Sequence, residues 1–112
     1  MISSDGGQSI SHQPLPGCVR RALDAMRANL ERRWTLGELA TVGGVSVRTL
    51  QRQFTSFLGK PPQAVLRDIG FGQARNELLQ GRPDDKVMDV AWRCGFAHYG
   101  RFAVEYRRRY GE

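Results

Sequence analysis

The sequence lacks the features that mark membrane and secreted proteins. None of its apolar runs approaches the roughly 20 residues that a membrane-spanning helix needs. Its N-terminus lacks the basic start and apolar core of a signal peptide. The two cysteines, Cys18 and Cys94, lie far apart, which argues against a disulfide framework and suits a reducing compartment. We therefore expect a cytoplasmic protein with no membrane partner.

Enzyme motifs and metal-binding patterns are also missing. The sequence contains no G-x-S-x-G, no P-loop and no carboxylate pair near a histidine. No cluster of candidate ligands has the spacing of a zinc site. Cys94 is expected to be a small buried apolar side chain, with a redox or metal-binding role as the alternative. We expect no enzymatic activity, no cofactor and no metal ion.

Basic residues outnumber acidic ones. The 112 residues, enough for one small domain, include 17 Lys and Arg but 11 Asp and Glu, for a net charge of +6. This balance favours a nucleic acid or an anionic membrane as partner, and charge alone does not choose between them.

The stretch 35–54 predicts two short helices separated by a tight turn. Thr35 and Glu38 fit the S/T-x-x-E capping box, which satisfies backbone donors at a helix start. The pair Gly43–Gly44 is expected to end this helix, because glycine enters the left-handed region at little cost. Ser46 can then cap the next helix with its hydroxyl group.

The second of these helices has an apolar face and a polar face. Leu50 and Phe54 fall on one side of it, i to i+4. Arg48, Gln51 and Arg52 fall on another, and such side chains reach phosphates and base edges well. A short helix that supports a second helix of this kind is the helix-turn-helix device for the DNA major groove. The alternative is an ordinary helical hairpin whose arginines are solvated.

The pattern of this stretch recurs near the C-terminus. E-L-A-x-x-G-G-V, which starts at Glu38, is echoed by D-V-A-x-x-C-G-F, which starts at Asp89. Phe102 and Tyr106 then repeat the apolar pair of the first motif, with one more residue in the turn. An accidental hairpin would rarely repeat its alanine, its turn glycine and its apolar spacing. Two spaced copies therefore favour DNA binding more strongly than one.

Helices are predicted elsewhere and strands nowhere, so the expected fold class is all-α. Residues 1–16 are polar and rich in Ser, Gly and Pro, which predicts a flexible tail or linker. Apolar periodicity predicts a first helix over 17–33, a long connecting helix over 62–80 and a last helix over 99–110. Trp34 is expected to pack at a junction. We expect two small cores, one for each motif.

The connecting helix contains two glycines, Gly70 and Gly72, which each cost about 1 kcal/mol relative to Ala. They put the rigidity of the connector in doubt. Before the following helix, Asp84 and Asp85 suit its positive N-terminal dipole. The candidate core positions of the connecting helix are Val65, Ile69, Ala74, Leu78 and Leu79.

The two motifs together resemble the DNA-binding domain of the AraC/XylS family of bacterial transcription regulators. The resemblance begins near Cys18 and rests on T-L-x-E-L-A-x-x-x-x-x-S-x-R-T-L-x-R-x-F and D-V-A-W-R-C-G-F-x-H-Y-G-R-F-x-x-x-Y-R-R-R-Y-G-E. It implies a domain over 17–112 with helix-turn-helix subdomains at 35–58 and 86–110, joined by the linker helix 62–80. Each subdomain is implied to be a homeodomain-like three-helix unit whose second helix enters the major groove.

The resemblance also implies partners. The first is double-stranded DNA, and RNA polymerase is a further candidate. Regulators of this family usually carry a separate effector-sensing or dimerising domain. None is present in these 112 residues, so we expect the chain to be the DNA-binding part of a longer protein.

By the same resemblance, Arg48, Gln51 and Arg52 match the positions that contact bases in the first motif. The remaining positions are expected to support them or to face DNA in the second motif. The expected DNA-facing set is Ser46, Arg48, Thr49, Gln51, Arg52, His98, Tyr99, Arg101, Ala103 and Val104.

The second motif departs from the family pattern. Gly100, Ala103 and Val104 stand where the first motif has its polar trio, and their side chains cannot donate hydrogen bonds. We expect this motif to position the domain through Arg101, or to touch thymine methyl groups through its apolar side chains. His98 replaces the usual small capping residue and is expected to cap the helix or meet a phosphate.

Other interpretations stay open at this point. Arg107, Arg108 and Arg109 can form a solvated face, a phosphate-contacting end or a surface for RNA polymerase. A small helical adaptor that binds a partner protein is the alternative function. RNA binding is weaker, because no sheet with stacking aromatic residues is predicted. Salt-dependent binding to a duplex would separate a DNA reader from an adaptor.

Overall fold

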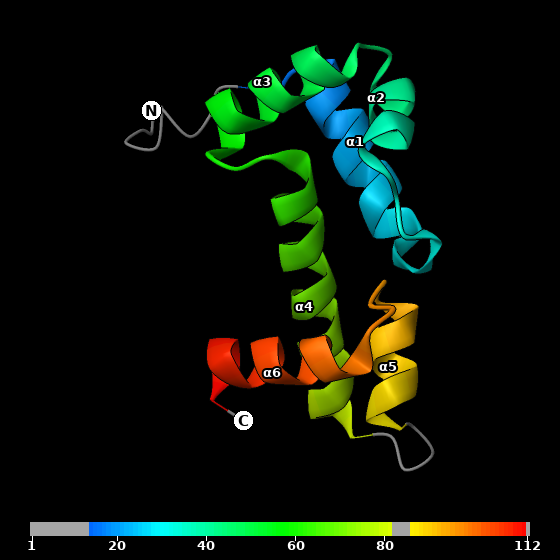
Figure 1. The fold of residues 1–112 in the computed structure, drawn as a ribbon. Coiled ribbons are helices and arrows are strands. Elements are labelled where there is room, and N and C mark those ends of the chain that lie inside the picture. Colours follow the sequence, from blue (N-terminus) through cyan, green and yellow to red (C-terminus); the bar gives the residue numbers. More distant parts are fainter. Residues whose placement is uncertain (1–13, 82–85, 112) are drawn as a thin grey trace, which may run out of the picture.

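The computed structural model describes residues 14–81 and 86–111, and every regular element within them is helical (Figure 1). These elements are α1 Gly17–Ala28, the 3-10 helix η2 Leu30–Arg32, α2 Leu36–Gly43, α3 Val47–Leu58, α4 Pro62–Gln80, α5 Val87–Arg93 and α6 Tyr99–Tyr110. The predicted all-α fold class is confirmed. Among the described helices, none combines the length and the apolarity needed to span a bilayer.

Two hydrophobic cores form, one toward each end of α4 (Figure 1). The first core packs α1, α2 and α3 around Leu39, Leu50 and Phe54, which are fully buried. The second packs α5 and α6 against α4 around Phe71 and Phe102. The predicted pair of small cores is confirmed, and the molecule has two lobes joined by one helix.

The connecting helix α4 buries a different face in each lobe. Val65, Leu66 and Ile69 pack against the first core, and Phe71, Ala74 and Leu78 pack in the second. At 3.6 residues per turn, these two sets lie on roughly opposite faces of the helix. The predicted core position Leu79 is wrong, since its side chain is 62% exposed, whereas Phe71 was not predicted and is fully buried.

Gly70 allows α4 to approach the second motif closely. A Cβ atom at this position would lie 2.8 Å from the Cys94 carbonyl oxygen and 3.0 Å from the Phe96 ring. A Cβ atom at Gly72 would meet nothing within 4 Å. The helix runs without interruption through both glycines. Packing therefore requires glycine at the first of these positions and not at the second.

The first helix is shorter than predicted. It ends at Ala28, and η2 follows, instead of one helix that continues to Arg33. The backbone leaves the helical region at Asn29 (φ −152°, ψ 75°), and Arg33 has a left-handed φ of 58°. Leu30 is consequently only partly buried. Trp34 packs against the first core, as predicted.

Residues 14–16 do not fit the tail that was predicted over 1–16. Leu15 packs against the first core, and Pro16 occupies the N-cap position of α1. The expected tail is therefore wrong for these residues. The rest of the tail and the pair Asp84–Asp85 lie outside the described residues.

Candidate nucleic-acid interface

Local hydrogen bonds hold the first helix-turn-helix as its sequence predicts. The Thr35 hydroxyl accepts from the Glu38 amide at 3.1 Å, and the Glu38 carboxylate accepts from the Thr35 amide at 2.9 Å. This bond from the backbone lowers the pKa of Glu38, so the carboxylate is charged at neutral pH. Gly44 ends α2 with a φ of 74°. Ser46 accepts from the Thr49 amide at 3.1 Å and starts α3.

Arg21 on α1 supports the turn from outside the motif. Its guanidinium donates to the Gly43 carbonyl at 2.6 Å, at the end of α2, where carbonyls lack intrahelical partners. Gly43 is itself tightly packed, because a Cβ atom there would lie 3.2 Å from the Cys18 carbonyl oxygen. The sequence did not point to Arg21, since no short-range pattern links it to a residue so far along the chain.

The helix α3 buries one face in the first core and exposes the other to solvent. Leu50 and Phe54 are fully buried in the first core. Arg48, Gln51 and Arg52 are exposed, and within the described residues their side chains form no hydrogen bond or ion pair. The described part of the chain therefore leaves their donors available to a partner.

The second motif repeats the helix order but not the caps. Gly95, with a φ of 96°, makes the turn after α5, and the Phe96 amide donates to the Ala91 carbonyl at 3.0 Å. His98 occupies the N-cap position of α6, but its side chain makes no capping hydrogen bond. The capping role predicted for His98 is therefore wrong, and its side chain remains exposed.

The helix α6 presents fewer polar groups than α3. Phe102 and Tyr106 are buried in the second core. Gly100 and Arg101 are exposed, and Val104 is 60% exposed. The expected DNA-facing residues of this motif are all at least partly accessible: His98, Tyr99, Arg101 and Val104 are exposed, and Ala103 is partly buried.

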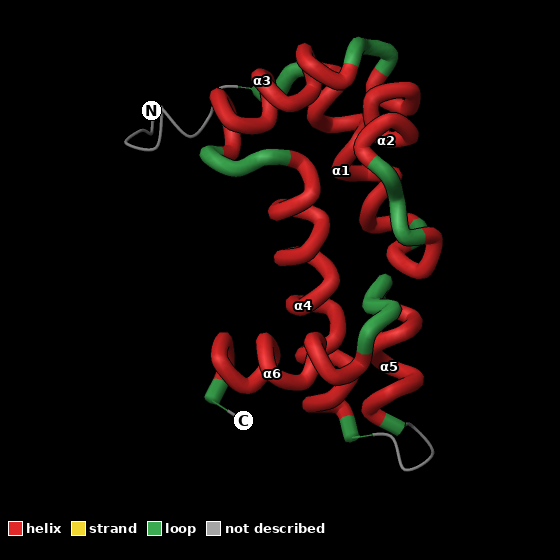
Figure 2. The backbone as a smooth tube through the Cα atoms, viewed as in Figure 1, coloured by secondary structure: helices red, strands yellow, loops and turns green. Residues whose placement is uncertain are grey.

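The expected DNA-facing residues form two sets, one on α3 and one at the start of α6. The two helices lie across opposite ends of α4 and extend to the same side of it in the view of Figure 2. The 19 residues of α4 correspond to a helix about 28 Å long. The structure thus brings each set together on its own helix and separates the two sets by the connecting helix.

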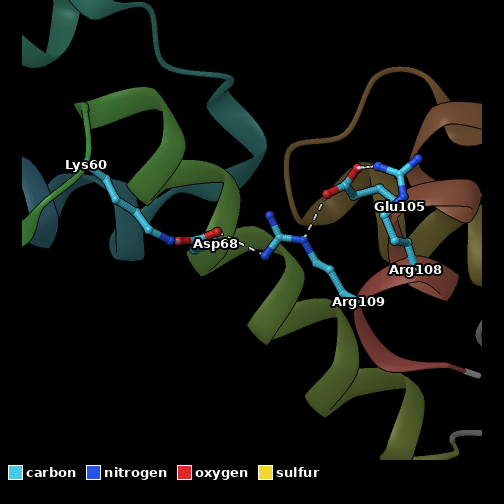
Figure 3. Close-up of polar contacts among 5 residues, drawn as sticks. All are labelled: Lys60, Asp68, Glu105, Arg108 and Arg109. Carbon is cyan, nitrogen blue, oxygen red and sulfur yellow. Dashed lines mark hydrogen bonds and ion pairs between the residues drawn. The ribbon is translucent and has the colours of Figure 1, made fainter.

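An ion-pair network ties α6 to α4 (Figure 3). Arg109 lies 2.9 Å from Asp68 and 3.3 Å from Glu105, and its guanidinium carbon lies 4.4 Å from the centre of the Phe71 ring. Lys60 pairs with the same aspartate. Partial burial opposes ionisation of Asp68, but hydrogen bonds from Lys60 and Arg109 outweigh it and lower its pKa. Arg109 therefore helps to fix the position of α6 on α4.

This network distinguishes Arg109 from the other two C-terminal arginines, Arg107 and Arg108. The side chain of Arg109 is 29% exposed and is committed to contacts within the molecule. Arg108 pairs with Glu105 at 3.2 Å, but its side chain is 70% exposed. Arg107 is also exposed. The solvated, phosphate-contacting and polymerase-contacting interpretations thus remain for Arg107 and Arg108.

Cys94 is a buried thiol whose surroundings favour its protonated form. It is 3% exposed, and its sulfur lies 4.0 Å from a carboxylate oxygen of Glu77. Burial, followed by the negative charge of Glu77, raises the pKa of the Cys94 thiol to about 12. This agrees with the predicted small buried apolar side chain. The described residues contain no group of three or more His, Cys, Asp or Glu placed to hold a metal ion.

Comparison with known proteins shows similarity to transcription regulators. Residues 39–112 match a family model described as a helix-turn-helix domain. The chain is 42% identical over 98 residues to the probable thc operon regulatory protein of Rhodococcus erythropolis. It is 29% identical over 107 residues to the HTH-type transcriptional activator RhaS of Yersinia pestis. These matches cover 87% and 96% of this chain but 30% and 38% of those proteins, so the chain spans about a third of their length.

Two solved structures have a similar fold. One is a transcriptional regulator with an AraC-type DNA-binding domain from Chromobacterium violaceum, with a TM-score of 0.75 and 28% identity over 85% of this chain and 83% of that one. The other is a probable AraC family transcriptional regulator from Rhodopseudomonas palustris, with a TM-score of 0.74 and 32% identity over 85% and 88%. The likeness extends over most of the chain and so includes both lobes.

Proposed function

The chain belongs to the AraC/XylS family of helix-turn-helix DNA-binding domains, and we propose that it recognises a specific double-stranded DNA sequence through α3 and α6. The observation that carries this proposal is the pair of helix-turn-helix motifs at the two ends of α4, each with an accessible second helix. A protein-interaction adaptor is not favoured, because the similar proteins are transcription regulators.

In this proposal the domain over 17–112 is divided into two DNA-contacting subdomains, which we call the first and second readers, and a linker between them. The first reader is 35–58, the linker is 62–80 and the second reader is 86–110. The second helices enter major-groove segments about one helical turn, roughly 34 Å, apart on one side of the duplex. The connecting helix is about 28 Å long, so we expect the DNA to bend toward the protein or the helices to tilt.

The two readers have different side chains for the same task. Arg48, Gln51 and Arg52 can form directional hydrogen bonds, and arginine can hold a guanine edge with two of them. Their exposure, and the absence of hydrogen bonds and ion pairs from their side chains within the described residues, support a role as base readers. The second reader offers the exposed Arg101 to phosphates and the methyl groups of Val104 to thymine.

We further propose that the domain acts as part of a longer regulator. The relatives are about three times its length, which leaves room for a separate effector-sensing or dimerising domain. RNA polymerase is the expected protein partner at the promoter, for which Arg107 and Arg108 are exposed candidates. In the cell, the protein would then lie in the cytoplasm, associated with the nucleoid through DNA.

Selection of bound sequences from random duplex DNA tests this function. The protein should enrich one sequence pattern, and its affinity for that duplex should fall steeply as the salt concentration rises, since phosphate contacts release counterions. The same selection with Arg52→Ala should relax the pattern at one or two base pairs. Failure to enrich any sequence, together with salt-insensitive binding, would contradict a DNA reader.

A further inference from the structure

The connecting helix α4 carries an arginine that points toward the second reader. Arg67 lies one helical turn before Phe71, on the face of α4 that meets the second lobe. Its guanidinium carbon lies 5.3 Å from the centre of the Phe71 ring and 5.9 Å from that of Phe96. These aromatic faces attract the cation and favour this position of the exposed side chain.

Arg67 and Arg101 share two hollows between α4 and α6. One, of about 450 Å³, is also lined by Gly100, Val104 and Arg108. The other, of about 240 Å³, also includes His98. Because the two arginines appear together in both hollows, the connecting helix and the second recognition helix contribute to one basic surface.

The charge of this surface is not neutralised within the described part of the chain. Glu105 is the only acidic residue among those that line either hollow. Its carboxylate oxygens already accept from Arg108 at 3.2 Å and from Arg109 at 3.3 Å. Asp68, next to Arg67 in the sequence, pairs with Lys60 and Arg109. The surface therefore has an excess of positive charge and suits an anion.

The larger hollow opens on the side of α6 that we propose faces DNA. Gly100 and Val104, which line it, occupy the positions of Arg48 and Arg52 in the first motif. A Cβ atom at Gly100 would meet nothing within 4 Å, so the helix surface beside the hollow is open. A phosphate group of a duplex that lies against α6 could therefore reach the arginines.

We propose that Arg67 and Arg101 together bind one backbone phosphate of the DNA at the second reader. This inference rests on the proposed function and adds the connecting helix to the DNA-contacting elements. Guanidinium groups donate paired hydrogen bonds to phosphate oxygens, which gives both affinity and a fixed position. The contact supplies the second reader with affinity that Gly100, Ala103 and Val104 cannot provide by hydrogen bonds from their side chains.

Binding titrations of Arg67→Ala over a range of salt concentrations test the contact. The variant should bind matched and mismatched duplexes roughly tenfold more weakly at low salt. The slope of its log affinity against log salt concentration (the salt slope) should be shallower by about one released ion. Arg67→Lys keeps the charge but not the paired hydrogen bonds, so it should recover the salt dependence and only part of the affinity. Arg27→Ala is the matched control, because this exposed α1 arginine lines a different hollow that contains Glu31 and Glu77. It should bind as the wild type does.

Single methylphosphonate substitutions in the duplex, which remove the charge of one phosphate, locate the contact. One position, in the groove segment at the second reader, should weaken wild-type binding more than it weakens binding by Arg67→Ala, because the variant has already lost one of the two arginines at that phosphate. The proposal would be overturned if every methylphosphonate weakened binding by the wild type and by Arg67→Ala by the same factor. It would also be overturned if Arg67→Ala bound DNA as tightly as Arg27→Ala does. Binding of inorganic phosphate that depends on Arg67, with unchanged DNA affinity, would also overturn it and assign the site to free phosphate.

The same titrations distinguish this failure from failure of the proposed function. If the wild type binds its selected sequence and the Arg67 variants bind it as tightly as Arg27→Ala does, the phosphate contact is wrong and the proposed DNA binding stands. If the wild type shows no salt-dependent duplex binding, the proposed function itself fails. Melting temperatures equal to that of the wild type confirm that each variant is folded.

Discussion

The guanidinium carbon of Arg33 lies 3.6 Å from the centre of the Trp92 ring, and this contact joins the two lobes. Arg33 lies between η2 and α2, whereas Trp92 lies on α5. The arginine has a left-handed φ of 58°, and its Nε and Nη2 atoms are buried without a hydrogen-bond partner in the described residues. Close by, a Cβ atom at Gly95 would lie 2.7 Å from the Leu30 carbonyl oxygen. The lobes are therefore in direct contact beside α4.

We expect Trp92→Ala to weaken the contact between the lobes. The loss of the cation–π interaction should lower the free energy of unfolding by about 1 kcal/mol, since Trp92 is 48% exposed and such contacts are weaker at exposed sites. Trp92→Phe retains an aromatic face and should lose less. Urea denaturation of both variants measures the difference. Equal stability of Trp92→Ala and the wild type would show that the stack contributes nothing.

The two glycines of α4 should respond in opposite directions to alanine. Gly72→Ala should raise the free energy of unfolding by roughly 0.5–1 kcal/mol, because the new methyl group meets nothing and alanine favours a helix. Gly70→Ala should lower it by about 1–3 kcal/mol, because the methyl group overlaps the Cys94 carbonyl. Thermal melts of the two variants provide matched controls for each other. Stabilisation by both would contradict the close approach of α4 to the second motif.

Ala91 is expected to tolerate no larger side chain. It is 1% exposed in the second core, so Ala91→Leu should overpack the helix crossing and lower the free energy of unfolding by roughly 1–3 kcal/mol. Met88→Leu on the same helix is the control, since Met88 is 60% exposed and should change stability little. Chemical denaturation would reject the described packing if both variants were as stable as the wild type.

The thiol of Cys94 should make stability sensitive to alkaline pH. Its pKa is raised from 9.0 to about 12 on folding, so its contribution to stability is complete below pH 9 and is lost as the pH rises toward 12. The free energy of unfolding of the wild type should therefore fall above pH 9. Cys94→Ala should fall less steeply over the same range, although both proteins share the titration of other groups. If the free energy of unfolding fell equally steeply with pH in both proteins, the Cys94 thiol would lie in a more hydrated environment than described.

Local signals in the sequence predicted much of the fold. The capping box at Thr35, the glycine stop at Gly44 and the serine cap at Ser46 are satisfied within a few residues, so their patterns fix helix ends without tertiary information. The limits of α4 are marked in the same way by Pro62 and Gly81. Where such signals are weak, as at Asn29, the predicted helix continued too far.

Contacts between distant segments could not be predicted in this way. The core positions of α4 were misassigned at Leu79 and missed at Phe71, because the helix packs against two lobes on opposite faces and has no single apolar stripe. The bond from Arg21 to the α2 terminus and the pairing of Arg109 with Asp68 each join separate helices. Expected site residues such as Arg52 were predicted to be exposed, but their DNA contacts remain predictions.

The central claim is that the two readers divide the work unequally. Arg52 can form directional hydrogen bonds to a base, so Arg52→Ala should cost about 1–3 kcal/mol on the preferred site and relax the choice at one or two base pairs. Arg101 is expected to meet phosphate. Arg101→Ala should therefore weaken binding to all sequences alike and make the salt slope shallower by about one contact.

The most direct test is a binding titration of Arg52→Ala and Arg101→Ala against matched and mismatched duplexes at several salt concentrations. The ratio of affinities for the two duplexes should shrink for Arg52→Ala and stay at the wild-type value for Arg101→Ala. If Arg101→Ala instead changed base preference while Arg52→Ala lowered all affinities equally, the roles of the two readers would be reversed and the account contradicted.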